Sequence, residues 1–317
     1  MTSNTLKSCR LCDATGPHAI FQAIEMMYNS REAFDYFECS ECGTVQIVTD
    51  LEQDILAGHY PKNYYSFNSS EHSALKKLAM TKRDIHLLDR KSLIGAIIAF
   101  FKPDPVMSLI GSLHLSKDSR ILDVGCGSGA LLDRLGRAGF KDLVGVDAFI
   151  EKNMVTKTGA KIEKAELKDI TGQFDLVMFH HSLEHMPDLR GTLNDARNKL
   201  KKDGLCIVRI PTVSSLAWSE YRESWFQLDA PRHLVLPSRK GMKIAAEGEA
   251  FKLIKTVDDS MGRQFEYSEN YRAGIPLFGD QPHLRFTATQ KREFARKAKE
   301  ANEANEGDQT AFVLQAA

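Results

Sequence analysis

Residues 121–132 read Ile-Leu-Asp-Val-Gly-Cys-Gly-Ser-Gly-Ala-Leu-Leu, and this stretch decides the fold. An apolar run leads into three glycines at alternate positions, and a helical pattern follows them. Gly125, Gly127 and Gly129 permit a tight turn and let a ligand approach the backbone, while the start of the following helix offers free N–H groups. The stretch therefore predicts a strand, a ligand-binding turn and a helix.

A second apolar run, Leu143-Val-Gly-Val-Asp147, ends on a carboxylate 18 residues after Gly129. At this distance from a glycine-rich turn, a carboxylate can accept hydrogen bonds from both hydroxyls of a ribose. The two stretches together predict a ligand that contains adenosine.

The glycine turn fits two classes of cofactor site. From Gly125 onward it satisfies the dinucleotide pattern G-x-G-x-x-A, which is typical of nicotinamide sites. Asp123 extends it to D-x-G-x-G-x-G, which resembles motif I of the class I S-adenosylmethionine-dependent methyltransferases. Residues 174–185 resemble the fourth strand of that superfamily with its active-site end, and residues 200–211 resemble its fifth strand. These matches keep their order across residues 105–260 and favour the methyltransferase interpretation.

This resemblance implies S-adenosylmethionine as the cofactor. Its contacts are then expected from Asp123, Gly125, Cys126, Gly127, Gly129, Asp147, Ala148, Phe179 and His180. The implied fold is α/β and Rossmann-like, a doubly wound, mostly parallel seven-stranded sheet covered on both faces. The segment 149–159 departs from the superfamily because it leaves little room for the helix usual there.

The chain divides into three expected regions. Residues 1–48 form a small zinc ribbon, residues 49–104 a linker and helical region, and residues 105–317 the methyltransferase domain. The linker carries aromatic side chains at 60–67 that are expected to fold back on the catalytic domain. An insertion at about 259–308 precedes the last strand, and it is expected to cap the acceptor because ligands of open α/β sheets bind beyond the carboxyl ends of the strands.

Two C-x-x-C pairs in the N-terminal region predict a metal site. Cys9 and Cys12 form the first pair, and Cys39 and Cys42 form the second, with 26 residues between the pairs. This spacing is typical of a zinc ribbon, and four thiolates leave no open coordination position. The zinc is therefore expected to be structural, in a region where few apolar residues are available to hold a fold.

The composition of the chain limits the kinds of partner that it is expected to bind. Of the 317 residues, 42 are basic and 42 are acidic, so no overall field recruits nucleic acid. The N-terminus lacks the apolar segment of a signal peptide, which predicts a cytoplasmic protein. The longest apolar run, residues 93–101, is too short to cross a bilayer. Basic residues precede it, which is compatible with contact to a membrane surface or an anionic ligand, but packing on the catalytic domain or on another subunit is favoured because most such runs are buried. The oligomeric state stays open as well.

Candidate bases follow two predicted strands. His180, His181, Glu184 and His185 lie at the end of the fourth strand, and Asp229 and His233 follow the fifth. A hydroxyl acceptor must lose a proton, and a neutral imidazole oriented by a carboxylate is suited to remove it near neutral pH. We therefore expect His233, oriented by Asp229, to act as the base, with His181 as the alternative.

The segment Trp225-Phe-Gln-Leu-Asp-Ala-Pro-Arg-His233 narrows the resemblance. Together with residues 60–65 and 181–188, it resembles a bacterial group of methyltransferases of surface-polysaccharide and glycan biosynthesis. A sugar or glycan acceptor in polysaccharide or natural-product biosynthesis is what this implies. Trp225 and Tyr271 are then expected to stack on a pyranose, and Arg232 to hold a carboxylate or phosphate. O-methylation is favoured over carbon methylation, because the similar sugar C-methyltransferases carry a further large C-terminal domain.

Two other functions fit the same motifs. A zinc ribbon on a methyltransferase core also resembles certain ribosomal RNA guanine methyltransferases, which predicts a basic ribbon. Residues 8–48 contain only Arg10 and Arg31 as basic residues, so an RNA base as acceptor is disfavoured. The remaining alternative is a non-catalytic, cofactor-binding scaffold, which the retained motif residues argue against.

Overall fold

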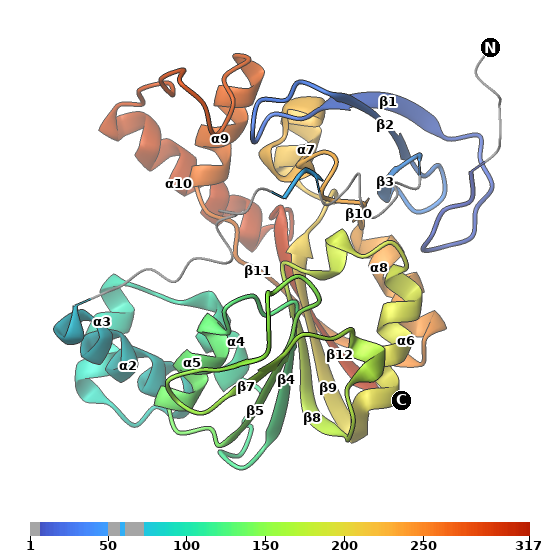
Figure 1. Cartoon of the computed structure of the whole chain (residues 1–317). Coiled ribbons are helices and arrows are strands. Elements are labelled where there is room, and N and C mark those ends of the chain that lie inside the picture. Colours follow the sequence, from blue (N-terminus) through green and yellow to red (C-terminus); the bar gives the residue numbers. More distant parts are fainter. Residues whose placement is uncertain (1–6, 50–57, 61–72) are drawn as a thin grey trace.

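The computed structural model describes residues 7–49, 58–60 and 73–317. One large twisted sheet runs through the lower part of the molecule in Figure 1, and a smaller sheet packs above its carboxyl edge. Within the described residues, no helix combines the length and the apolar character needed to cross a membrane. Most of the aromatic segment at 60–67 lies outside the described residues; only its first residue, Tyr60, is placed.

The large sheet has the strand order β11-β12-β9-β8-β4-β5-β7-β6. In chain order its strands are β4 (Arg120–Val124), β5 (Asp142–Val146), β6 (Met154–Val155), β7 (Lys161–Glu163), β8 (Phe174–His180), β9 (Leu200–Pro211), β11 (Phe251–Asp258) and β12 (Gln309–Ala316). Pairs β4–β5, β4–β8, β5–β7 and β8–β9 are parallel. The last strand, β12, returns antiparallel between β9 and β11.

The strand count corrects the prediction of seven strands. An eighth strand, β6, has two residues and pairs antiparallel with β7 at the sheet edge. It lies in the segment 149–159, where the sequence left no room for a full helix. This segment is too short for a helix that covers the sheet, and it forms instead a short strand that pairs with β7 at the sheet edge.

Helices cover both faces of the sheet, as expected of a doubly wound fold. One apolar cluster joins β8 and β9 to α6 (Leu189–Lys199) and α8 (Arg239–Gly248). The other face packs on α2 (Ala74–Asp89), α4 (Pro105–Gly111) and α5 (Ala130–Arg137). Helix α3 (Leu93–Phe101) packs on α2 at the outer end of that layer (Figure 1).

The N-terminal ribbon shares its sheet with the catalytic part of the chain. Its strands are β1 (Ala19–Ile24), β2 (Ala33–Glu38) and β3 (Val45–Ile47). Strand β10 (Val235–Leu236), which directly follows His233, pairs antiparallel with β3 and completes a four-stranded sheet. The ribbon and the chain after β9 therefore form one packed unit.

The insertion before the last strand is helical. It contains α9 (Arg263–Arg272) and α10 (Ala288–Glu303), which stand beside α7 (Leu216–Tyr221) at the end of the molecule that carries the smaller sheet (Figure 1). Helix α10 begins with a capping box in which Thr287 and Gln290 satisfy each other's backbone N–H groups. The insertion thus lies above the carboxyl edge of the large sheet.

Candidate functional site

The glycine turn after β4 has the conformation its residues predict. Gly125, Gly127 and Gly129 have φ angles of +72°, +51° and +71°, in the left-handed region that favours glycine. A Cβ at Gly125 would lie 2.4 Å from the Cβ of Ser182, so the backbone passes close to the end of β8. The turn delivers the chain to the start of α5, whose first N–H groups face the same edge.

Two carboxylates stand at this turn. Asp147 accepts hydrogen bonds of 2.8 Å from the N–H of Gly127 and from the N–H of Phe149, which fixes its carboxylate beside the turn. Asp123 is buried, and its Oδ1 has no hydrogen-bond partner among the described residues. Burial, with the nearby charge of Asp147, raises the pKa of Asp123 to about 7. The site therefore holds an unsatisfied acidic group next to the predicted ribose carboxylate.

The other predicted cofactor residues divide into accessible and inaccessible ones. Ala148 is exposed, and His180 is half-buried with its Nε2 3.3 Å from Nη1 of Arg209. Cys126 packs toward the backbone of β5, where a Cβ at Gly145 would lie 2.5 Å from its Sγ. Phe179 is fully buried in β8, because the side chains of a central strand point into the two covered faces; a cofactor contact of this residue stays a prediction.

The acceptor end of the site is a cluster of imidazoles around one buried carboxylate. Glu184 lies in a 3-10 turn directly after β8, and its side chain is fully buried. Ligand atoms of Glu184, His185 and His233 all lie within 4.8 Å of one another. The sequence placed these residues after two different strands, and the fold brings them together.

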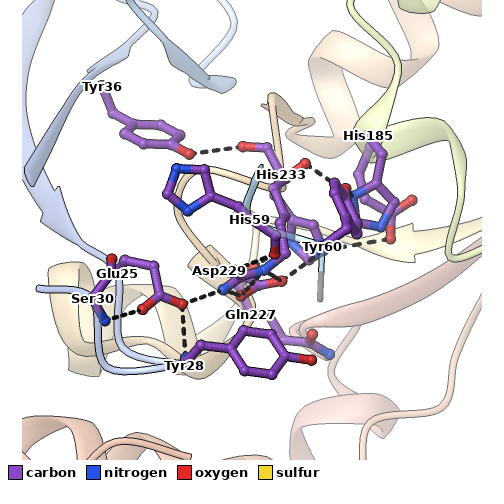
Figure 2. Close-up of polar contacts among 12 residues, drawn as sticks. Glu25, Tyr28, Ser30, Tyr36, His59, Tyr60, His185, Gln227, Asp229 and His233 are labelled. Carbon is purple, nitrogen blue, oxygen red and sulfur yellow. Dashed lines mark hydrogen bonds and ion pairs between the residues drawn. The ribbon is translucent and has the colours of Figure 1, made fainter. Parts of the chain in front are cut away.

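Backbone carbonyls orient two of the imidazoles. Nδ1 of His233 lies 2.7 Å from the carbonyl oxygen of Gln227, and Nδ1 of His185 lies 2.9 Å from that of Arg232. A carbonyl only accepts, so each Nδ1 carries the proton and each Nε2 keeps its lone pair. The hydroxyl of Tyr60 lies 3.0 Å from the same Nδ1 of His185, as Figure 2 shows.

His181, the alternative base, is engaged on both ring nitrogens. Nη1 of Arg209 donates to its Nε2 at 2.6 Å, and its Nδ1 lies 3.4 Å from Oε1 of Glu184. Arg209 in turn donates to Oδ2 of Asp259 at 2.7 Å. An imidazole that accepts from a guanidinium at Nε2 carries its proton on Nδ1, so it has no free lone pair to remove a proton.

Asp229 does not orient His233, which corrects the predicted pair. Its Oδ2 lies 3.9 Å from Nε2 of His233, beyond hydrogen-bond length, whereas Nη2 of Arg232 donates to its Oδ1 at 2.6 Å. Arg232 also donates to Oε1 of Glu25 at 2.8 Å, so two carboxylates neutralise its fully buried charge. Arg232 borders a cavity of about 140 Å³, but it holds the ribbon to this loop and has no charge left for a substrate anion.

The predicted sugar platform is also corrected. Trp225 is fully buried, and its Nε1 donates to Oδ2 of Asp308 at 2.9 Å. Tyr271 is 7% exposed and packs against Phe226, with ring centroids 5.7 Å apart. Both rings are buried in the structure and bury apolar area by packing on neighbouring side chains.

The four ribbon cysteines converge. Sγ of Cys9 lies 3.6 Å from that of Cys42, and Sγ of Cys12 lies 3.6 Å from that of Cys39. All four sulfurs lie within 4.8 Å of one another. Tetrahedral zinc with bonds of about 2.3 Å separates its sulfur ligands by about 3.8 Å, so the arrangement fits the metal.

Sequence reasoning missed the residues that support this site. Arg209 positions His181, and its signal was a lone arginine within the apolar run Cys206-Ile-Val-Arg-Ile of β9. Glu25 pairs with Arg232 over 207 residues of sequence, and nothing in the local pattern marked it. Gln227 acts through its backbone carbonyl, which carries no residue-specific signal.

Comparisons with known proteins identify a methyltransferase domain in this chain. A family model described as a methyltransferase domain matches residues 87–256. The ubiquinone biosynthesis O-methyltransferase of Azorhizobium caulinodans is 30% identical over 187 residues, which cover 53% of this chain and 74% of that protein. The mitochondrial protein of the same name from Saccharomyces cerevisiae is 38% identical over 90 residues, 24% of this chain and 29% of that one.

Solved structures show a weaker likeness. The magnesium protoporphyrin IX methyltransferase of Synechocystis is 10% identical with a TM-score of 0.44, covering 84% of this chain and 100% of that one. A methyltransferase from Archaeoglobus fulgidus is 18% identical with a TM-score of 0.41, covering 62% and 86%. At these scores we draw no conclusion from the likeness.

Proposed function

This chain belongs to the methyltransferase-domain family of S-adenosylmethionine-dependent enzymes, and we propose that it methylates a hydroxyl oxygen of a small-molecule or glycan acceptor. In this reaction the hydroxyl oxygen bonds to the sulfonium methyl carbon, and the carbon–sulfur bond breaks to leave S-adenosylhomocysteine. The hydroxyl proton must leave as well. The chemistry thus requires an aligned cofactor and a group that makes the hydroxyl a nucleophile.

The observation that carries this proposal is the cluster of Glu184, His185 and His233 beside the glycine turn. Ser182 links the two, because its hydroxyl donates to the carbonyl of Val124 at 2.6 Å, just before the turn. Two imidazoles and a carboxylate converge there, and neither carboxylate oxygen has a hydrogen-bond partner among the described residues. Such a group is suited to an acceptor that carries an acidic or polarisable O–H.

On the cofactor side, we assign the ribose to Asp147 and the amino-acid end to the turn of Gly125–Gly129. The carboxylate of Asp147 is held in place by two backbone N–H groups, so it is preorganised to accept from ribose hydroxyls. Ala148 is exposed directly after it, which leaves room for the adenosine.

In the ribbon, we assign a structural zinc ion to Cys9, Cys12, Cys39 and Cys42. Four thiolates close the coordination sphere, so the metal stabilises the ribbon and takes no part in methyl transfer. Gln46 supports this site by donating from Nε2 to Sγ of Cys9 at 2.9 Å. Gln46 also lies on β3, which pairs with β10.

For the acceptor, we propose a sugar hydroxyl, as in the glycan methyltransferases that the sequence resembles. A phenolic hydroxyl is the second candidate, and the relatives named for ubiquinone biosynthesis favour it. The loss of Trp225 and Tyr271 as a stacking platform leaves the sugar without an identified binding surface. The two acceptors therefore have to be compared directly.

Methyl transfer from labelled S-adenosylmethionine tests the proposal. The intact protein is incubated with nucleotide sugars, lipid-linked glycans, catechols and RNA in separate reactions, and the labelled product is treated to distinguish methyl ethers from N-methyl and C-methyl groups. We expect a methyl ether on a sugar. A labelled catechol selects the second candidate. Label on RNA bases, or cofactor binding without transfer to any acceptor, contradicts the proposal.

A further inference from the structure

The cluster around Glu184 has the composition of an open metal site. Two imidazole nitrogens and one carboxylate oxygen, all within 4.8 Å, come from His185, His233 and Glu184. Two histidines and one glutamate form one of the ligand sets of catalytic zinc, in which a fourth position stays open for water or substrate. The residues lie at the carboxyl edge of the sheet, where the acceptor is expected.

Both histidines are oriented as metal ligands. The carbonyl oxygens of Gln227 and Arg232 hold the Nδ1–H groups, so both Nε2 atoms keep their lone pairs for a metal ion. Figure 2 labels both histidines. Metal-bound histidines almost always donate their second N–H to a carbonyl or carboxylate in this way. The hydroxyl of Tyr60, 3.0 Å from Nδ1 of His185, adds a further outer contact.

Glu184 supplies a second, independent observation. Its side chain is fully buried, and neither carboxylate oxygen has a hydrogen-bond partner among the described residues. Its nearest basic atoms are Nδ1 of His181 at 3.4 Å and Nε2 of His233 at 4.0 Å. A buried carboxylate that lacks hydrogen bonds is costly, and a cation between the groups would remove that cost.

The distance between Nε2 of His233 and Oε1 of Glu184 fits two ligands of one metal ion better than it fits a hydrogen bond. Metal bonds of about 2.1 Å in a tetrahedral site place neighbouring ligand atoms about 3.4 Å apart. The 4.0 Å between Nε2 of His233 and Oε1 of Glu184 exceeds hydrogen-bond length and needs only a small side-chain movement to reach that value.

We propose that Glu184, His185 and His233 bind one divalent transition-metal ion whose open position takes the acceptor hydroxyl. The second part rests on the proposed O-methylation. Coordination makes the hydroxyl more acidic, its proton passes to water, and the metal-bound oxygen attacks the methyl carbon while the carbon–sulfur bond breaks. His233 is then a ligand, and this role replaces the general-base role predicted from the sequence.

Binding of Mn²⁺ distinguishes the proposed site from the cysteine site of the ribbon. Mn²⁺ prefers nitrogen and oxygen ligands over thiolates, so it leaves the four cysteines to zinc. The full-length zinc-loaded protein is titrated with Mn²⁺, and free Mn²⁺ is counted by electron paramagnetic resonance. We expect one bound Mn²⁺ per chain. Glu184→Gln and His233→Gln should each weaken binding at least tenfold, because even an outer-shell partner contributes 10–100-fold to metal affinity.

His114→Gln is the matched control, since His114 is exposed and lies outside the cluster. Affinity for S-adenosylmethionine, measured on every variant, confirms that the catalytic domain remains folded, and His185→Gln replaces any variant that loses it. No Mn²⁺ bound by the wild-type chain, or the same affinity in the folded Glu184 and His233 variants, overturns the proposal.

A second experiment tests whether the bound metal ion takes part in methyl transfer to the acceptor. Chelation with EDTA, under conditions that retain the ribbon zinc, should abolish methyl-ether formation, and Mn²⁺ should restore it in wild type but not in Glu184→Gln. Transfer that is unaffected by chelation overturns the metal role while leaving O-methylation intact. Mn²⁺ binding without methyl-ether formation retains the metal site and contradicts the proposed function instead.

Discussion

Two neighbouring aspartates at the predicted cofactor site, Asp147 and Asp123, differ in the free-energy cost of carrying a charge. Asp147 is satisfied by two backbone N–H groups, whereas the neighbouring Asp123 is buried with Oδ1 unpaired. The first carboxylate is positioned to bind, and the second is costly to ionise. Each therefore responds differently to removal of its charge.

Replacing Asp147 with alanine should weaken the binding of S-adenosylmethionine. A hydrogen bond to a charged group contributes roughly 1.5–3 kcal/mol, which corresponds to about tenfold or more in the dissociation constant. Titration calorimetry measures it, with Asp142→Ala as the control, because Asp142 begins the same strand and is exposed. Equal affinity of the wild type and the Asp147 variant would remove the ribose assignment.

Asp123 should make the cofactor-free protein less stable as the pH rises. Its folded pKa is about 7, and an unfolded aspartate has a pKa of about 3.9, so between these values only the folded state holds the proton. The free energy of unfolding therefore falls as the pH rises from about 4 to about 7, on the order of a few kcal/mol.

Asp123→Asn keeps the shape and removes this titration. Urea unfolding at pH 5 and pH 8 should show a smaller decline in the variant than in the wild type, whereas Asp280→Asn, at an exposed position, should leave the decline unchanged. An identical decline in the wild type and the Asp123 variant would contradict the raised pKa.

At the scale of elements, the pairing of β3 with β10 connects the ribbon to the cluster. Strand β10 follows His233 directly, and the hydroxyl of Tyr36 in β2 donates to the carbonyl of His233 at 2.9 Å. The backbone N–H of Leu234 also donates to the carbonyl of Glu184 at 2.8 Å. A folded ribbon therefore fixes the loop that carries His233 and, through Leu234, contacts the turn that carries Glu184 and His185.

Loss of the ribbon metal should consequently reduce methyl transfer more than cofactor binding. We expect about one zinc per chain by elemental analysis after removal of loosely bound metal, and none in a Cys39→Ser/Cys42→Ser variant. That variant should keep its affinity for S-adenosylmethionine, since the glycine turn lies in the large sheet. Cys206→Ala is the control, because Cys206 is buried in β9 outside the ribbon. Zinc retained in the double variant would refute the assignment.

The sequence predicts those elements whose pattern is local. The glycine turn, the parallel strands and the antiparallel last strand each have a local signature, and the structure has them. The pairing of β10 has none, because two residues carry no periodicity and its partner lies some 190 positions earlier. For the same reason Arg232 was expected to bind substrate, although its partner Glu25 in the ribbon neutralises it.

At the scale of the whole molecule, helix α3 has an apolar surface that is exposed among the described residues. Helix α3 packs on α2 through Gly95, where a Cβ would lie 2.0 Å from the carbonyl oxygen of Lys82. Its outer side chains include Leu93, Phe100 and Phe101, which are 88%, 81% and 75% exposed. Figure 1 places α3 and the ribbon at opposite ends of the molecule. Exposed apolar groups of this extent mark an interaction surface.

Charge favours an anionic lipid surface as the partner of α3. Exposed Lys91 and Lys102 flank the helix, and basic residues beside an apolar face are typical of helices that lie in a membrane interface. We expect the protein to sediment with vesicles that contain anionic lipid and much less with neutral ones. Phe100→Ser/Phe101→Ser should reduce binding at least tenfold, because each buried aromatic side chain contributes roughly 1.5–3 kcal/mol. Ile20→Ser, an exposed apolar residue of β1 in the ribbon, is the control and should bind as the wild type does. If the protein sediments with neither kind of vesicle and forms a dimer in solution that the double variant dissociates, α3 contacts protein and not lipid.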